Sequence, residues 1–231
     1  MKRPAAFSQV WWQEKGLTAM LVFLILSIFV ALPLETLNVV SPTLVGAIMT
    51  LLILSGVMAM AGRGLMTVVV ALIAVASLLA RWLTVFHPGR TVAIWDLSLA
   101  MVAIGWFTAF VLQQIFRAGP ITADRIRGSI LAYLLLGIVW CLAYQLVNVF
   151  VPDAFRFPES QIPVYGRLNH HLVYFSFITL TTVGYGDITP VYPIARTLAT
   201  AEGLIGQLYP AILIARLVSL ELSQRQSATS K

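Results

Sequence analysis

One stretch of the sequence decides the fold, and it is Thr181-Thr182-Val183-Gly184-Tyr185-Gly186-Asp187. Gly184 and Gly186 alternate with residues that carry side chains, so the backbone can adopt left-handed dihedrals at both glycines and turn successive carbonyl groups toward one axis. Unpaired backbone groups of this kind cannot face lipid, because each costs several kcal/mol in hydrocarbon, but they can line a water-filled path. The stretch therefore predicts a membrane protein with a pore.

The composition agrees with a membrane protein. Apolar residues make up 59% of the chain and charged residues 10%, whereas soluble domains have about 45–50% and about 25%. The net charge of +6 comes from basic residues near the ends of apolar segments, which indicates lipid headgroups rather than nucleic acid as partners. The single cysteine excludes an intrachain disulfide. No catalytic constellation or cofactor motif is present, so we expect a protein that is not an enzyme and has no cofactor.

Six apolar segments are long enough to cross a membrane, since about 20 residues span the roughly 30 Å of hydrocarbon. They cover residues 17–32, 43–61, 65–86, 91–116, 130–151 and 194–220. The first is expected to stop at Pro33. The predicted fold is an all-α membrane protein with six transmembrane helices, and a re-entrant pore helix and filter loop lie between the fifth and the sixth.

These segments divide the chain into five parts. They are a cytoplasmic N-terminal segment (1–16), a four-helix membrane domain without voltage-sensor arginines (17–117), a cytoplasmic linker (118–129), a pore domain of outer helix, pore helix, filter and inner helix (130–220), and a short cytoplasmic tail (221–231). The linker contains a predicted helix cap at Thr122. Its basic residues, with the one just before it, are expected to meet anionic lipid on the inner leaflet; they are Arg117, Arg125 and Arg127.

Basic residues near the spans collect on the cytoplasmic side of a membrane. An orientation with both termini inside places ten of the fifteen Lys and Arg residues on that side. The other five are then outside, and they are Arg81, Arg90, Arg156, Arg167 and Arg196. We therefore expect an integral protein of the cell membrane with cytoplasmic termini and a filter that opens to the outside.

The segment before the filter predicts a short helix. Asn169 is a good N-cap residue, and about ten helix-compatible residues follow it. The carbonyl end of such a helix carries about half a negative charge, which would stabilise a cation at the filter.

Over residues 169–220 the chain resembles the pore domain of tetrameric potassium channels, and the whole chain looks like a six-helix bacterial member. In that family the carbonyl oxygens of this glycine-containing string replace the hydration shell of K⁺. The resemblance implies that K⁺, the permeant ion, is bound by the carbonyl groups of Thr182, Val183, Gly184 and Tyr185, together with the Thr182 hydroxyl. It also implies that the residues supporting the filter are Thr181, Gly186, Asp187 and Tyr174, with the Tyr174 hydroxyl available to bond Asp187.

One filter string per chain supplies a quarter of a ring of carbonyls, so we expect a homotetramer. The predicted function is passive, potassium-selective conduction through that pore. Three alternatives stay open: a non-selective cation channel, an ion-coupled transporter, and a non-conducting accessory subunit whose filter no longer functions. Transporters usually show a repeated pair of broken helices, and here only one broken segment occurs.

The fourth segment indicates that gating is not steeply voltage-dependent. Each charge moved through 100 mV contributes only about 2.3 kcal/mol, so steep gating needs several charges. No Lys or Arg occurs in residues 91–116. Asp96 is the ionised candidate there, and we expect it near the outer end, where water reaches it.

The sixth segment contains candidate gate and cavity residues. Pro210 has no N–H to bond the carbonyl of Gly206, so this pair is a candidate hinge of an inner gate, with a fixed kink or close helix packing as the equal alternative. Gly203, Gln207, Pro210 and Ile214 are spaced to share one helical face. Gln207 and Ile214 on that face are candidate cavity-lining residues.

Glu202 is unusual because an ionised carboxylate at mid-span costs about 2.5–3.5 kcal/mol. A structural hydrogen bond, to Ser176 or a threonine, is favoured over a titrating regulatory role. His170 and His171 are expected at the outer mouth, where they are either proton sensors or solvated cap residues.

Overall fold

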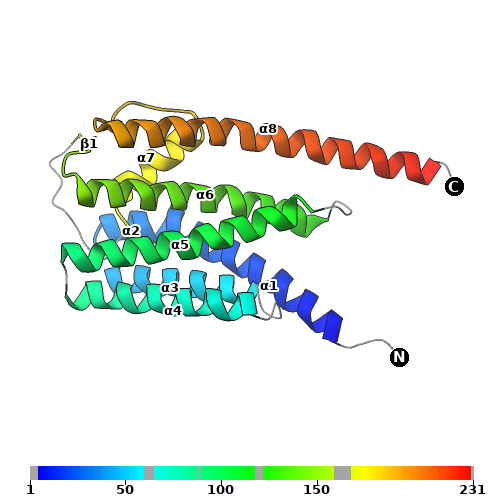
Figure 1. The fold of residues 1–231 in the computed structure, drawn as a ribbon, viewed down its shortest axis with the longest axis horizontal. Coiled ribbons are helices and arrows are strands. Elements are labelled where there is room, and N and C mark those ends of the chain that lie inside the picture. The colour runs from blue at the N-terminus through cyan, green and yellow to red at the C-terminus, as the bar shows by residue number, and fades with distance from the viewer. Residues whose placement is uncertain (1–4, 60–64, 88, 118–121, 159–167, 230–231) are drawn as a thin grey trace.

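The computed structural model describes residues 5–59, 65–87, 89–117, 122–158 and 168–229, and it is mostly helical (Figure 1). The elements in chain order are α1 (Ala5–Leu26), η1 (Ser27–Ala31), α2 (Leu32–Thr36), α3 (Pro42–Ala59), α4 (Leu65–Phe86), α5 (Arg90–Ile115), α6 (Ala123–Phe150), β1 (Phe155–Arg156), α7 (His170–Leu180), β2 (Thr189–Pro190) and α8 (Pro193–Thr229).

Five helical stretches in the described residues are long and apolar enough to cross a membrane. They are Gly16–Thr36, Thr67–Thr84, Arg90–Ile115, Asp124–Phe150 and Pro193–Ser219. The apolar helix Leu44–Ala59, which is most of α3, is shorter. The protein is thus an all-α membrane protein with five candidate spans.

The central helix of the bundle is α6, which contacts α1, α5, α7 and α8. Its fully buried residues recur at helical spacing and form one apolar stripe, which comprises Leu131, Leu135, Ile138 and Leu142. In Figure 1, α7 lies between α6 and α8 on one side of the molecule, and α4 lies on the opposite side. The start of α1 and the end of α8 lie at the same end of the bundle.

The prediction that the first helix stops at Pro33 is wrong. A short π-helical segment, Ser27–Ala31, leads directly into α2, and the N–H of Leu32 donates to the carbonyl of Ser27. Pro33 then occupies the first turn of α2, a position at which a helix tolerates proline. The wider π turn therefore carries the chain past the proline.

The segments expected to flank the spans are more helical than predicted. The helix α1 begins at Ala5, α6 begins at Ala123 within the predicted linker, and α8 continues to Thr229. The predicted cap at Thr122 is confirmed, because its side chain accepts a hydrogen bond from the N–H of Arg125. Four of the ten basic residues expected on the cytoplasmic side, and one of the five expected outside, lie outside the described residues; they are Lys2, Arg3, Arg63 and Lys231, and Arg167.

A two-stranded antiparallel ribbon holds the segment that follows the filter. Phe155 pairs with Pro190 and Arg156 with Thr189. The N–H of Val191 also donates to the carbonyl of Ala154 at 2.8 Å. These bonds anchor the end of the filter segment to the chain just beyond α6.

Candidate functional site

The short helix α7 points its carbonyl end at the filter segment. Asn169 caps it as predicted, because its side chain accepts a hydrogen bond from the N–H of His171 at 3.0 Å. At the other end, the carbonyl of Leu180 accepts a hydrogen bond from the Tyr133 hydroxyl at 3.1 Å. Five side chains on its buried face fix the helix, and they are Leu172, Val173, Phe175, Ser176 and Leu180.

The filter backbone turns left-handed at both glycines, as predicted. The φ angle is 54° at Gly184 and 79° at Gly186. Thr182 also has a positive φ, of 60°, which a β-branched residue rarely adopts. Three conformations of this kind within five residues produce the irregular backbone that a row of carbonyls requires.

Among the described residues, N–H groups of this backbone segment form hydrogen bonds, but its carbonyl groups do not. The N–H groups of Val183 and Gly184 donate to the carbonyl of Ile178 at 2.9 and 3.2 Å, and the N–H of Thr182 donates to that of Thr179 at 2.9 Å. Within the described part of the chain, no hydrogen bond uses the carbonyl oxygens of residues 182–185 as acceptors. Four consecutive carbonyl groups are therefore left for another partner.

All residues from Thr181 to Asp187 are exposed in the single chain. Tyr185 is 72% exposed and Val183 53% exposed. Because the flanking helices are apolar, such a segment is expected to line a water-filled space or contact another chain.

Residues next to the filter bond back toward α7. The Thr181 hydroxyl donates to the carbonyl of Phe177 at 2.7 Å. One Asp187 oxygen accepts from the N–H of Ile188 at 3.0 Å, and the Tyr174 hydroxyl is close enough to the Asp187 carboxylate for the two groups to interact electrostatically. The Tyr174–Asp187 hydrogen bond that the resemblance implied stays a prediction.

Glu202 is fully buried between three helices. Its carboxyl contacts the Ser176 hydroxyl on α7 and the Tyr144 hydroxyl on α6, each at 2.5 Å. The predicted structural hydrogen bond to Ser176 is confirmed. Tyr144 was missed by the sequence reasoning, although a tyrosine in the middle of an apolar span signals a hydroxyl that needs a partner.

Gly206 lies where α8 meets the end of α7. A Cβ atom on Gly206 would be 1.9 Å from the carbonyl oxygen of Leu180, so close helix packing explains this glycine. Pro210 lies inside α8, and the helix continues through it. Whether the pair also forms a hinge stays a prediction.

The four α8 residues predicted to share one helical face do not all have the same surroundings; they are Gly203, Gln207, Pro210 and Ile214. Gln207 and Ile214 are exposed in the single chain, as cavity-lining candidates must be. Pro210 instead lines a groove between α6 and α8. Gln207 and Ile214 stay candidate cavity-lining residues, and Pro210 is a half-buried residue at the α6–α8 contact.

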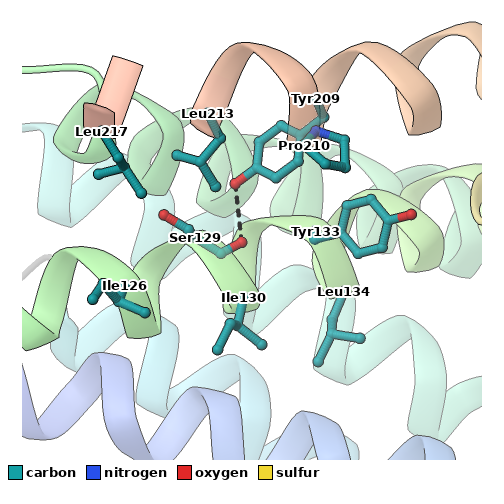
Figure 2. Close-up of a pocket in the computed structure, with 9 residues that line it drawn as sticks. All are labelled: Ile126, Ser129, Ile130, Tyr133, Leu134, Tyr209, Pro210, Leu213 and Leu217. Carbon is teal, nitrogen blue, oxygen red and sulfur yellow. Dashed lines mark hydrogen bonds between the residues drawn. The ribbon is translucent and has the colours of Figure 1, made fainter. Parts of the chain in front are cut away.

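The groove between α6 and α8 has a volume of about 280 Å³ and an almost entirely apolar lining (Figure 2). Figure 2 shows the Tyr209 hydroxyl reaching from α8 to the carbonyl of Ser129 on α6, a hydrogen bond of 2.9 Å. The other lining residues are Ile126, Ile130, Tyr133, Leu134, Pro210, Leu213 and Leu217. The Tyr209 bond ties the two helices together beside the proline.

The expectation that water reaches Asp96 is wrong, and the side of the membrane on which Arg81 lies stays a prediction. Arg81 and Asp96 are only 9% and 3% exposed. They form an ion pair between α4 and α5, with 3.7 Å between Arg81 Nε and Asp96 Oδ1. Opposite charges in adjacent helices stabilise each other away from water, which the count of basic residues did not consider.

The basic residues at the start of α6 bond to their surroundings. Arg125 donates to the carbonyl of Arg117 at 2.7 Å, which brings the end of α5 to the start of α6. Arg127 pairs with Asp124 at 2.9 Å on an exposed surface. All three basic residues of the predicted lipid contact therefore lie in one region.

The rings of His170 and His171 lie next to each other at the start of α7, with centroids 4.0 Å apart and ring planes tilted by 39°. Partial burial, and then the neighbouring His171 ring, lower the pKa of His170 from its ordinary value. Among the described residues, no group of three or more His, Cys, Asp or Glu side chains is placed to hold a metal ion.

The region from α7 into α8 also resembles known proteins in sequence. Residues 170–221, from α7 into α8, match the family model described as an ion channel. Protein LctB of Bacillus caldotenax is 28% identical over 125 residues, which cover 52% of this chain and 90% of that protein. Protein LctB of Geobacillus stearothermophilus is 50% identical over 46 residues, or 34% of its length.

A plant protein, two pore potassium channel c of rice (Oryza sativa subsp. japonica), is 33% identical over 97 residues, which cover 42% of this chain and 19% of that protein. No solved structure gives a significant match. Together with the membrane helices, these matches indicate a membrane protein with a region similar to ion channels.

Proposed function

We propose that this chain is the subunit of a potassium-selective channel that conducts K⁺ passively through the centre of a homotetramer. The observation that carries the proposal is the row of unused carbonyl groups at residues 182–185, which lies at the carbonyl end of α7. In the proposed pore these carbonyls and the Thr182 hydroxyl replace the water around K⁺. The negative end of the α7 dipole adds to the stabilisation of the cation.

The exposure of α8 supports assembly around an axis. Its membrane span is 17% buried, against 50% for the spans of α5 and α6. The exposed apolar side chains of α8 include Leu204, Leu208, Ile212 and Val218. Because the filter segment is exposed as well, four copies arranged with α8 and the filter innermost would cover both and close the ring of carbonyls.

The proposed topology has six membrane crossings, with α3 as the shortest. Both termini are cytoplasmic in the cell membrane, α7 is re-entrant, and the filter opens outward. The pore domain extends over 130–220, and the N-terminal domain over 17–117 surrounds it. The positions of the α1 start and the α8 end at one end of the bundle support an even number of crossings.

Flux into liposomes tests the proposal. Purified protein is reconstituted, and uptake of K⁺ is compared with uptake of Na⁺ under equal gradients. We expect fast K⁺-selective flux that Gly184→Ala abolishes, because an alanine at a φ of 54° is strained. Gly46→Ala is the matched control, since a Cβ there meets nothing within 4 Å, and it should keep the flux.

Each alternative gives a different result in this experiment. Equal K⁺ and Na⁺ flux would indicate a non-selective cation channel. Slow, saturable flux that requires a second ion would indicate a transporter. Flux that Gly184→Ala leaves unchanged would show that the filter segment is not the path.

We also propose that the channel is not steeply voltage-gated. The buried cation of α4, Arg81, is paired with Asp96, and a single charge moved through 100 mV supplies only about 2.3 kcal/mol. Open probability should therefore vary shallowly with voltage, whereas a steep dependence would show that more charges move.

Anionic lipid is the proposed partner of Arg117, Arg125 and Arg127, whose positions at the junction of α5 and α6 support a shared headgroup site. Each basic residue near an anionic surface contributes about 1 kcal/mol. Replacing all three by glutamine should reduce the phosphatidylglycerol that co-purifies relative to phosphatidylcholine. An unchanged ratio of phosphatidylglycerol to phosphatidylcholine would contradict the proposal that these arginines bind anionic lipid.

A further inference from the structure

A polar cluster joins the three helices of the pore domain where no water reaches. It consists of Tyr144 on α6, Ser176 on α7 and Glu202 on α8, and each side chain is 0% exposed. The rings of Phe155 and Phe175 pack edge-on against Tyr144, with centroids 5.5 and 5.1 Å away. The cluster is thus held rigidly on the side of α6.

Three short oxygen–oxygen contacts run through this cluster. The Tyr144 hydroxyl is 2.5 Å from Glu202 Oε2, and the Ser176 hydroxyl is 2.5 Å from Glu202 Oε1. The same Ser176 oxygen is 2.7 Å from the carbonyl oxygen of Gly137 on α6. Oxygen atoms at these distances require a hydrogen atom between them.

Counting the hydrogen atoms fixes the protonation of the carboxyl group. The Gly137 carbonyl can only accept, so Ser176 must donate its single proton to it. Ser176 then has no proton left for Glu202 Oε1, and Tyr144 supplies the proton for Oε2. The contact between Ser176 and Oε1 is therefore a hydrogen bond only when Oε1 itself carries a proton.

We propose that Glu202 is a neutral carboxylic acid that donates to Ser176 and is the positioning residue that fixes the pore helix α7 between α6 and α8. A neutral acid also avoids the cost of an unpaired buried charge. One helical turn along α8, Gly206 abuts the carbonyl of Leu180. The inner helix thus holds α7 at two points, one by a side chain and one by backbone contact.

Infrared spectroscopy of the purified full-length chain tests the protonation. Carboxyl-labelled [¹³C]glutamate separates glutamic acid bands from those of Asp96. At pH 7 we expect a carboxylic acid C=O band that shifts with the label and disappears in Glu202→Gln. Glu35→Gln, which removes a half-buried carboxyl on α2, is the control and should keep the band. Absence of the band in the wild type overturns the proposal, whether or not any variant folds.

The positioning role rests on the proposed potassium conduction, and it is tested by the ratio of K⁺ to Na⁺ flux. Glu202→Gln should keep this ratio within about twofold, because the amide donates to Ser176 and accepts from Tyr144. Glu202→Leu and Ser176→Ala each leave buried groups unpaired, and should lower the ratio at least about tenfold.

The two kinds of failure are distinguishable. A labelled band without flux in the wild type would contradict the proposed function and leave the proton on Glu202 established. Two results in a potassium-selective wild type would overturn the positioning role. In one, Glu202→Gln lowers the K⁺ to Na⁺ flux ratio as much as Glu202→Leu does. In the other, Glu202→Leu and Ser176→Ala both keep the wild-type ratio.

Discussion

Gly206 on α8 lies directly against Leu180, the last residue of α7, so that a Cβ on Gly206 would be 1.9 Å from the Leu180 carbonyl oxygen. The carbonyl belongs to the backbone and is also bonded by Tyr133, so it has little freedom to move away. The filter begins at the next residue. Helix α8 is therefore in direct contact with the end of α7, at the residue just before Thr181.

Gly206→Ala should destabilise the protein by about 1–3 kcal/mol, as overpacking does, and thermal unfolding in detergent measures the effect. The control is Gly105→Ala on α5, where a Cβ has open space and alanine stabilises a helix by about 0.5–1 kcal/mol. Equal melting temperatures for the two variants would show that the two backbones are not in close contact.

Pro210→Ala tests the bend without adding bulk at the contact. Alanine restores the N–H that bonds the Gly206 carbonyl, so the helix becomes stiffer. If the bend opens the gate, single-channel recordings should show a lower open probability. Pro193→Ala is the control on the same helix, because Pro193 is its first residue and an N–H there has no intrahelical partner. If Pro210→Ala leaves the open probability unchanged, the bend at Pro210 is a fixed kink and not the hinge of a gate.

Breaking the buried Arg81–Asp96 pair should strongly destabilise the N-terminal helices. Arg81→Met leaves Asp96 buried and unpaired, which costs about 3–5 kcal/mol. The control is the exposed pair of Arg127 and Asp124, whose removal should cost no more than about 1 kcal/mol. Thermal unfolding of Arg81→Met and Arg127→Met compares the two. Similar losses in both variants would show that burial does not distinguish the pairs.

His170 should be neutral at pH 7. Partial burial and the adjacent His171 ring lower its pKa, so it takes up a proton only as the pH falls below the ordinary histidine value of about 6.5. Its imidazole NMR signal, assigned by its loss in His170→Gln, should titrate with a midpoint below that value. A midpoint at or above it would mean that the outer end of α7 is more hydrated.

Local signals in the sequence predicted the α7 region well. Asn169 predicts the helix start because a cap acts within one turn, and glycine predicts the positive φ of Gly184 and Gly186 because only it adopts that conformation freely. Thr182 gave no such signal, since β-branched residues normally avoid positive φ. Its conformation follows from the turn that bonds Val183 and Gly184 back to α7.

Contacts between helices were harder to predict. Arg81 and Asp96 lie at nearly equal distances in sequence from the α4–α5 connection, and this symmetry would have placed them opposite each other. The predictions for Arg81 and Asp96 used only their distance from the end of a span. That distance carries no information about a partner on the next helix. The π turn before Pro33 and the contact of Tyr144 with Glu202 likewise depend on packing.

The most direct test of potassium selectivity is the reversal potential of single channels in a planar bilayer, with K⁺ on one side and Na⁺ at equal concentration on the other. A pore that strips water from K⁺ with the carbonyls of residues 182–185 predicts a reversal potential displaced far from zero, with the sign of a K⁺ current. A reversal potential at zero would mean that the pore does not distinguish the two ions, and it would contradict the account.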